Sequence, residues 1–335
     1  MMLLQLRFEH MICACETNIC ANMPPPKNMS IKKGFRGILC PIVTPFTKED
    51  VIDEQKLRRI VNIVIEDGAA GLAPTGGTGE VQYLLHEERV KIWEIVIDEA
   101  NGRVPVLAGT GAASTKEARI FTQKAKDVGC DGVMLSHPLT PALTRVTDEQ
   151  QYKYFEEIAN KVDIPIMMHN NPATIGVTMS PGVIERLSSN FDNIVSYKED
   201  DFFYPRFAEI VRRCKDKITI LTGGPEVYLA FLTLGAHGAV TAEFQACPHL
   251  MKGLKESFEK GDAKEALNFH EKIYKMNNII ETYFGNASFF PARWKAIWRL
   301  RGVDMEFSVR GPNSPVTPEQ LEKAAPEFKK LNIGR

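Results

Sequence analysis

The sequence predicts an α/β protein, a (β/α)8 or TIM barrel followed by a C-terminal helical annex. Between Gly37 and Thr241, eight short apolar runs alternate with amphipathic stretches of helical period. Alternation of this kind is typical of parallel βαβ units, and eight such strands close a barrel. After Gln245 the alternation stops and only helical patterns follow. We therefore expect a barrel over residues 34–246 and C-terminal helices over residues 247–335.

The eight strand-like runs are short, apolar and bounded by polar residues, as buried parallel strands are. They cover residues 37–43, 71–74, 104–108, 132–136, 164–169, 194–198, 218–221 and 238–241. Asp53, Ser114 and Thr147 stand where helix N-caps are expected. The alternative fold is a doubly wound open sheet, but that fold usually carries a glycine-rich phosphate turn after its first strand. Here the first strand is followed by Thr44-Pro45-Phe46 instead.

Three helical patterns, over residues 250–258, 263–284 and 291–300, follow the barrel, and Thr317-Pro318 begins a last helix. At the other end, residues 1–33 lack the order of a signal peptide and contain three consecutive prolines. Three cysteines in this segment lack the paired spacing of a zinc site, so we predict no metal. We expect residues 1–33 to be a disordered extension.

Composition narrows the class of protein. The chain has 335 residues and a formal net charge of -1, which leaves no electrostatic footprint for nucleic acid. No apolar run approaches the length of a membrane span, so we expect no membrane partner. The seven cysteines are irregularly spaced, which favours reduced thiols and a cytoplasmic protein.

The most informative stretch is the sixth apolar run, in which Ile194-Val195-Ser196-Tyr197 leads into Lys198. A lysine at the C-terminal end of a buried strand can be desolvated, and its amine can then attack a carbonyl carbon. The alternative is a surface lysine paired with Glu199 or Asp200. Strand alternation sends Glu199 to the face opposite Lys198, whereas Asp200 would oppose deprotonation if it pointed at the amine.

Two other strand ends carry polar groups. Thr75-Gly76-Gly77-Thr78-Gly79-Glu80 follows the second strand, where glycines let backbone N–H groups approach a carboxylate. His169 ends the fifth strand and can transfer protons near neutral pH. Each motif has a plainer interpretation, a flexible loop for the first and a histidine bonded to a backbone carbonyl for the second.

Together these segments resemble the dihydrodipicolinate synthase / N-acetylneuraminate lyase family of Schiff-base aldolases. The motifs run in the order GGTGE, HNNP, YKE, GGPE and GAVTA, with Phe35-Arg36-Gly37 before them and Pro291 to Ala296 after them. The resemblance implies a barrel enzyme, a homotetramer or homodimer, that binds pyruvate or another 2-oxo acid as an imine on Lys198. It implies that the Gly76 to Glu80 loop binds the carboxylate, and that no metal or organic cofactor is needed.

The sequence departs from the family at the positions that choose the second substrate. Gly77 replaces a threonine, His169 replaces a tyrosine, and Thr174 replaces the arginine that binds the second substrate's carboxylate. Leu139 and Thr140 stand near the place of another tyrosine. The lysine and the Thr78-Gly79-Glu80 part of the loop are retained, so imine formation and carboxylate binding are both expected.

We therefore predict a lyase that acts on a 2-oxo acid by aldol cleavage or condensation with an aldehyde, or by dehydration of a deoxy sugar acid. Lys198 is the predicted imine-forming residue and His169 the predicted general acid/base. Gly77, Thr78, Gly79, Val240 and Thr140 are the predicted substrate-binding residues. A dihydrodipicolinate synthase with altered relay residues and a non-catalytic barrel that binds 2-oxo acids are the alternatives. Phe202, Phe203 and Tyr204 are expected in the core of the next helix, or else in a pocket for an aromatic substrate.

Overall fold

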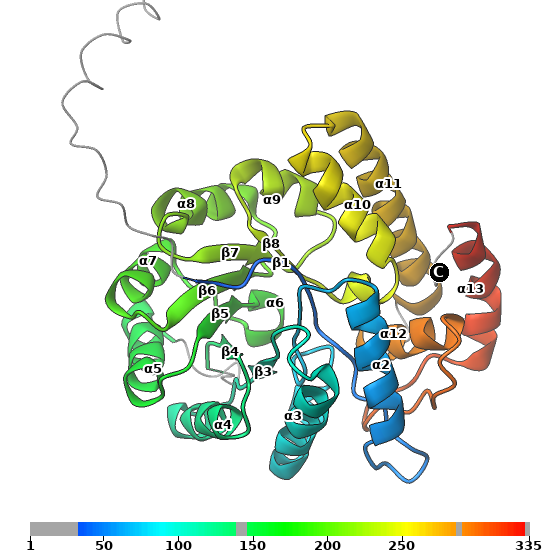
Figure 1. Ribbon diagram of the computed structural model, residues 1–335, viewed down its shortest axis with the longest axis horizontal. Coiled ribbons are helices and arrows are strands. Elements are labelled where there is room, and N and C mark those ends of the chain that lie inside the picture. Colours follow the sequence, from blue (N-terminus) through cyan, green and yellow to red (C-terminus); the bar gives the residue numbers. More distant parts are fainter. Residues whose placement is uncertain (1–32, 139–145, 286–289, 332–335) are drawn as a thin grey trace, which may run out of the picture. The chain divides into compact units, whose positions relative to one another are not determined.

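Eight parallel strands form the centre of the protein in the computed structural model, which describes residues 33–138, 146–285 and 290–331. The strands pair in the order β2-β1-β8-β7-β6-β5-β4-β3, and a parallel bridge from Leu72 to Val106 closes the ring (Figure 1). They are β1 (Gly37–Cys40), β2 (Gly71–Leu72), β3 (Leu107–Gly109), β4 (Gly132–Ser136), β5 (Ile166–Asn170), β6 (Ile194–Glu199), β7 (Thr219–Thr222) and β8 (Gly238–Val240). The predicted (β/α)8 barrel is thus confirmed, and the open doubly wound sheet is excluded.

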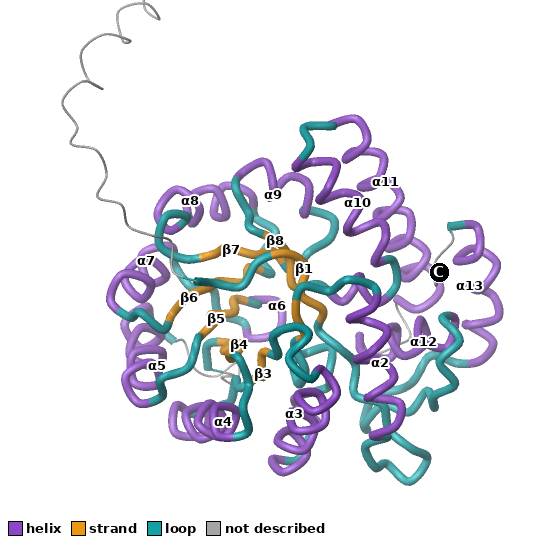
Figure 2. The backbone as a smooth tube through the Cα atoms, viewed as in Figure 1, coloured by secondary structure: helices purple, strands orange, loops and turns teal. Residues whose placement is uncertain are grey.

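Helices surround the strands on the outside of the ring (Figure 2). They are α2 (Glu54–Glu66), α3 (His86–Ala100), α4 (Thr115–Asp127), α5 (Asp148–Lys161), α7 (Pro181–Asn190), α8 (Tyr204–Cys214) and α9 (Tyr228–Leu234). Short turns of helix lie in three loops after strands, namely η1 (Val81–Tyr83), α6 (Pro172–Ile175) and η2 (Ala242–Gln245).

The helices begin where polar side chains can satisfy free backbone N–H groups. Asp53, Ser114 and Thr147 accept hydrogen bonds from the amides three residues later, at 3.0, 3.2 and 3.3 Å. Such a cap contributes about 0.5–2 kcal/mol compared with alanine. The predicted N-caps are all observed, and each fixes where the chain leaves its loop.

The inside of the barrel is filled with apolar side chains below the C-terminal ends of the strands. The described members of this cluster come from seven strands or strand ends and are Leu39, Ala73, Leu107, Met134, Met167, Leu221 and Val240. Phe35 packs against the cluster, and its amide donates to Ser196 Oγ at 3.0 Å. The interior is therefore a packed core rather than a pore, as in other barrels of eight strands.

The chain ends in α10 (Pro248–Glu259), α11 (Ala263–Ile280), the π-turn η3 (Glu281–Gly285), α12 (Phe290–Leu300) and α13 (Pro318–Lys330). These helices lie together beside α2 in Figure 1. They share one apolar cluster with β1, α2 and the C-terminal half of α3, in which Trp294 and Trp298 are fully buried. The C-terminal helices therefore cover the side of the barrel where β8, β1 and β2 meet.

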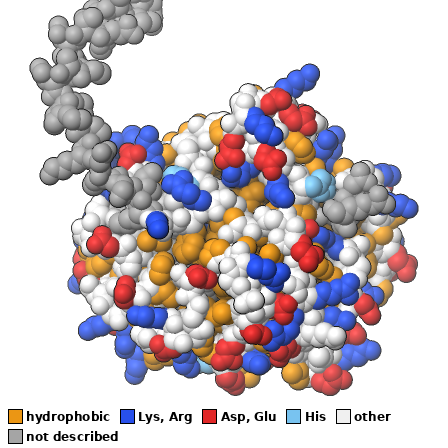
Figure 3. All heavy atoms as spheres, viewed as in Figure 1, with side chains coloured by type: hydrophobic (Ala, Val, Ile, Leu, Met, Phe, Trp, Pro, Cys, Tyr) orange, Lys and Arg blue, Asp and Glu red, His pale blue; other side chains and the backbone are white. Residues whose placement is uncertain are grey.

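Acidic and basic side chains are interspersed over the face shown in Figure 3, in keeping with the net charge of -1. No helix within the described part of the chain is long and apolar enough to cross a bilayer. Cys40, Cys130, Cys214 and Cys247 are buried free thiols.

Candidate active site

Lys198 lies near the C-terminal end of β6 and points into the barrel. Its register partners are His169 on β5 and Leu221 on β7, and Leu221 belongs to the interior cluster. The residue is only 7% exposed. Because side chains alternate along a strand, Tyr197 and Glu199 point outward. The expected separation of Glu199 from the lysine is thus observed.

Glu199 is instead held in a polar network between the barrel and its helices. Its carboxylate accepts hydrogen bonds from Asn170 Nδ2 at 2.5 Å and from Tyr197 Oη at 2.7 Å, and it pairs with Arg206 of α8. Burial raises the pKa of the Glu199 carboxyl, and the Arg206 guanidinium opposes that shift. These contacts attach β6 to β5 and α8 next to the lysine.

Asp200 is the acidic residue that reaches the lysine. Its Oδ2 atom lies 3.0 Å from Lys198 Nζ and 2.6 Å from His169 Nε2. Burial acts to raise the pKa of Asp200, but the charges of Lys198 and His169 outweigh it and lower that pKa to about 2. The lysine therefore does pair with a neighbouring acid, as the plainer interpretation of the sequence proposed, but the pair is inside the barrel mouth rather than on the surface.

Gly223 makes room for this pair at the end of β7. A Cβ atom at this position would lie 1.4 Å from Asp200 Oδ1 and 2.8 Å from Lys198 Cε. No residue other than glycine can stand there without moving Asp200. The GGPE motif by itself assigns no role to its first glycine, and the packing shows that this glycine leaves room for Asp200.

His169, the predicted general acid/base, is partly buried beside the lysine. Burial and the Lys198 charge lower the pKa of its imidazole, while Asp200 acts in the opposite direction. A second histidine, His137 at the end of β4, also has a lowered pKa, about 4, because of burial and the charge of His169. His169 is thus the histidine with a carboxylate partner in the site.

The loop after β2 presents two free backbone donors. The Gly79 amide donates to Gly76 O at 3.0 Å and the Glu80 amide to Gly77 O at 3.2 Å, so these two N–H groups are satisfied. Among the described residues, the amides of Gly77 and Thr78 have no hydrogen-bond partner. The Thr44 hydroxyl donates to Gly79 O at 2.8 Å and holds the loop in place. The geometry therefore favours the Gly77 and Thr78 amides as hydrogen-bond donors to a carboxylate. Gly79 instead helps to hold the loop in shape, because its amide and its carbonyl are both bonded within the protein.

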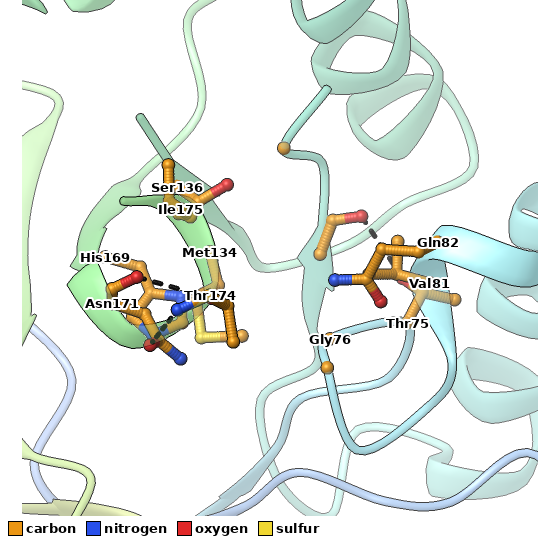
Figure 4. Close-up of a pocket in the computed structure, with 13 residues that line it drawn as sticks. Thr75, Gly76, Val81, Gln82, Met134, Ser136, His169, Asn171, Thr174 and Ile175 are labelled. Atoms are coloured by element: carbon orange, nitrogen blue, oxygen red, sulfur yellow. Dashed lines mark hydrogen bonds between the residues drawn. The ribbon is translucent and has the colours of Figure 1, made fainter. Parts of the chain in front are cut away.

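A cavity of about 70 Å³ separates this loop from the ends of β4 and β5. Figure 4 shows Gly76, Val81 and Gln82 on one wall and Met134, His169 and Thr174 on the other. A Cβ atom added to Gly77 would meet nothing within 4 Å, so there is open space at this position, where the sequence comparison expects a threonine. The described residues that line the cavity are Thr75, Gly76, Gly77, Val81, Gln82, Gly109, Gly111, Met134, Ser136, His169, Asn171, Thr174 and Ile175.

The far end of the same loop is tied to the C-terminal helices. Glu80 has a left-handed φ of 61°, and its Oε1 lies 2.5 Å from Nζ of Lys295 on α12, with both side chains fully buried. Lys295 also donates to Ser308 O at 2.6 Å and lies over the Phe46 ring. Burial lowers the pKa of Lys295 to about 8, and Glu80 partly offsets this.

The remaining predicted residues fall in different places. Val240 lies in the apolar interior cluster and is not among the described cavity-lining residues. Thr140 lies outside the residues that the structure describes. The interpretation of the aromatic run as helix core is wrong, because Phe202, Phe203 and Tyr204 are 50%, 61% and 49% exposed. They come after the end of β6 and before the buried face of α8. The two-residue period of a strand therefore does not predict which way these side chains point.

Sequence reasoning did not assign Asp200, Gly223 or Lys295 to the site. Asp200 had a signal, since it follows the lysine by two residues and shares its direction by strand alternation. Gly223 and Lys295 act through contacts distant in sequence, and no local pattern indicates them.

A buried lysine in a closed barrel, beside a histidine and a carboxylate, is an arrangement suited to forming a covalent imine with a carbonyl compound. The model of the Dihydrodipicolinate synthetase family matches residues 34–331. The chain belongs to this family, and is a class I, Schiff-base lyase. The resemblance seen in the motifs is thus confirmed over the length expected.

Relatives and solved structures agree with this placement. The chain is 37% identical to a 4-hydroxy-tetrahydrodipicolinate synthase of Pelobacter propionicus over 74% of this chain and 84% of that protein. It is 34% identical to that of Oceanobacillus iheyensis over 86% and 94% of the two chains. Among solved structures, a prophage protein of the dihydrodipicolinic acid synthase family from E. coli K12, in complex with pyruvate, has a TM-score of 0.83 at 26% identity, covering 89% of this chain and 99% of the other.

Proposed function

We propose that the protein forms an imine between Lys198 and pyruvate or another 2-oxo acid, and that it makes or breaks a carbon–carbon bond, or dehydrates a deoxy sugar acid, through that imine. One observation carries the proposal, the buried Lys198 amine inside a closed barrel at 3.0 Å from Asp200. A structural relative in complex with pyruvate supports the choice of 2-oxo acid.

The imine has a direct chemical use. As an iminium ion it accepts the electron pair left at C3 when a bond to that carbon breaks, and so replaces a carbanion with an enamine. The free amides of Gly77 and Thr78 are suited to the carboxylate of the 2-oxo acid, because oriented backbone N–H groups stabilise an anion. His169, at the cavity wall, is suited to proton transfer to the second carbonyl compound.

We infer that the second substrate carries no carboxylate at the end that enters the cavity. The cavity wall that includes Thr174 has no lysine or arginine among its described residues. A buried carboxylate without a cationic partner is costly. Space beside Gly77 and the apolar Met134 and Ile175 suits a neutral aldehyde or the neutral chain of a sugar acid.

A second function has support from the comparisons. Two relatives named 4-hydroxy-tetrahydrodipicolinate synthase are 37% and 38% identical to the chain. That reaction adds pyruvate to aspartate semialdehyde, which carries a carboxylate. The four departures from the family pattern, at Gly77, near Leu139-Thr140, at His169 and at Thr174, argue against it. A coupled assay with aspartate semialdehyde separates this function from ours. If the protein is instead a non-catalytic barrel that only binds 2-oxo acids, pyruvate forms an adduct but no second substrate is turned over.

The first step is tested by incubating the protein with pyruvate and borohydride and weighing it. We expect a covalent adduct on the parent protein, and none on Lys198→Met, which keeps the length of the buried stem. Lys252→Met is the control, since Lys252 lies on α10, its amine donates to Asp67 O, and it is not among the described residues that line the cavity. An adduct that persists in Lys198→Met, or its absence in the parent, contradicts the proposed function.

A further inference from the structure

Asp200 lies between the two groups that the proposed chemistry uses. One oxygen, Oδ2, contacts both Lys198 Nζ and His169 Nε2, at 3.0 and 2.6 Å. All three side chains are nearly buried, with exposed fractions of 9%, 14% and 13% for Lys198, Asp200 and His169. Gly223 leaves the space into which the other oxygen, Oδ1, extends.

We propose that Asp200 is a catalytic residue that carries protons between the Lys198 nitrogen and the substrate oxygen, with His169 as its partner. The inference rests on the proposed function and deepens it. It assigns to an aspartate and a histidine the proton transfers needed to make and break the imine. Both groups lie within hydrogen-bond reach of one another, as general acid/base partners must.

The proton count can be followed atom by atom. The Lys198 ammonium gives one proton to the Asp200–His169 pair, and the free lone pair forms a bond to C2 of the 2-oxo acid. The carbonyl π electrons move to oxygen, which takes a second proton from the nitrogen through Asp200. The first proton then returns to that oxygen, the C–O bond breaks and water leaves. Two of the three ammonium protons leave as water and the third stays on the iminium nitrogen.

Other acidic residues near Lys198 are less well placed to transfer protons to and from its nitrogen. Glu199 points away and is already bonded to Asn170, Tyr197 and Arg206. Glu243, after β8, has its pKa raised to about 7 by burial, and its carboxylate is bonded to the Thr241 hydroxyl. The groups whose charge acts on this cluster are therefore Lys198 and His169 in contact with Asp200, His137 beside His169, and Glu243 from η2.

The test compares rates of adduct formation with pyruvate, trapped by borohydride at fixed times, across pH 5 to 9. We expect Asp200→Asn to slow the rate by about 10²–10⁴-fold, the usual contribution of a positioned acid or base. Asp201→Asn is the matched control, because Asp201 is the adjacent acid and its carboxylate accepts a hydrogen bond from the Phe203 amide at 3.2 Å instead of contacting Lys198 or His169. That variant is expected to keep the parental rate and pH profile.

Chemical rescue distinguishes proton transfer from a structural role. Asp200→Ala leaves a space beside Gly223, and added formate is expected to raise its rate at least about 10-fold, whereas chloride at equal ionic strength is not. If the parent forms no adduct, the proposed function itself fails. If the parent forms the adduct and Asp200→Asn forms it at the parental rate, or formate leaves Asp200→Ala unchanged, the proposal for Asp200 is wrong.

Discussion

At the scale of single residues, strand alternation explains which side chains meet. It predicts that Lys198 and Glu199 lie on opposite faces, and the structure agrees. His169 was predicted at a strand end, and register places it level with the lysine. For Asp200, alternation predicts the same direction as Lys198, but whether its carboxylate reaches the amine does not follow from the local pattern. Its contact depends on Gly223, on another strand.

The role of Gly223 can be tested by adding one methyl group to it, in the variant Gly223→Ala. Gly223→Ala places a Cβ atom 1.4 Å from the observed position of Asp200 Oδ1, so the carboxylate must move. We expect borohydride trapping with pyruvate to slow by about 10-fold or more, since misplaced catalytic groups lose rate steeply. Gly182→Ala on α7 is the control, as its Cβ meets only Ser180 Oγ at 3.9 Å. An unchanged trapping rate in Gly223→Ala would show that Asp200 need not occupy its observed position.

At the scale of elements, the strand order follows from the sequence but the loops do not. Alternating apolar runs predict the eight strands, although the second is only Gly71–Leu72, shorter than the predicted 71–74. The short helix α6 is missed, because four residues cannot show a helical period. Its N-cap Asn171 accepts from the Thr174 amide at 3.3 Å, and this turn presents Thr174 to the cavity.

We propose that Thr174 helps to select the second substrate, and Thr174→Arg tests this proposal. An arginine at this position places a guanidinium at the cavity wall, where it can bind a carboxylate in bidentate fashion. We expect kcat/KM for aspartate semialdehyde with pyruvate to rise by about 10-fold, and that for a neutral aldehyde to fall or stay level.

Ala173→Arg is the control for this change. It adds the same charge to the neighbouring residue of α6, which is exposed and does not line the cavity among the described residues. Equal gains in the two variants would indicate a general electrostatic effect. A parent that already prefers aspartate semialdehyde to every neutral aldehyde would contradict the inferred substrate class.

At the scale of the whole molecule, the C-terminal segment contacts the loop after β2 through Glu80. The sequence predicts the C-terminal helices, but an apolar pattern cannot show that a lysine on α12 lies fully buried against Glu80, more than two hundred residues away. Arg310 adds to the same connection, since its amide donates to Glu80 Oε2 at 2.9 Å and its guanidinium pairs with Asp50 and Glu88. The barrel and the C-terminal segment are therefore coupled at the loop that is proposed to bind substrate.

This coupling is measurable as an interaction energy between Glu80 and Lys295. Lys295→Met alone leaves Glu80 buried and uncompensated, and we expect it to lower the free energy of unfolding by about 3–5 kcal/mol. Glu80→Gln with Lys295→Met removes both charges and is expected to be closer to the parent.

Because burial lowers the native pKa of Lys295 to about 8, the native state releases this proton before the unfolded state, whose pKa is about 10.4. The parent's free energy of unfolding, relative to the double variant, should therefore rise from pH 8 to about pH 10.4. Urea denaturation at several pH values measures this difference. If the difference in free energy of unfolding does not change with pH, and the effects of the two single variants sum to that of the double variant, the two side chains are not coupled.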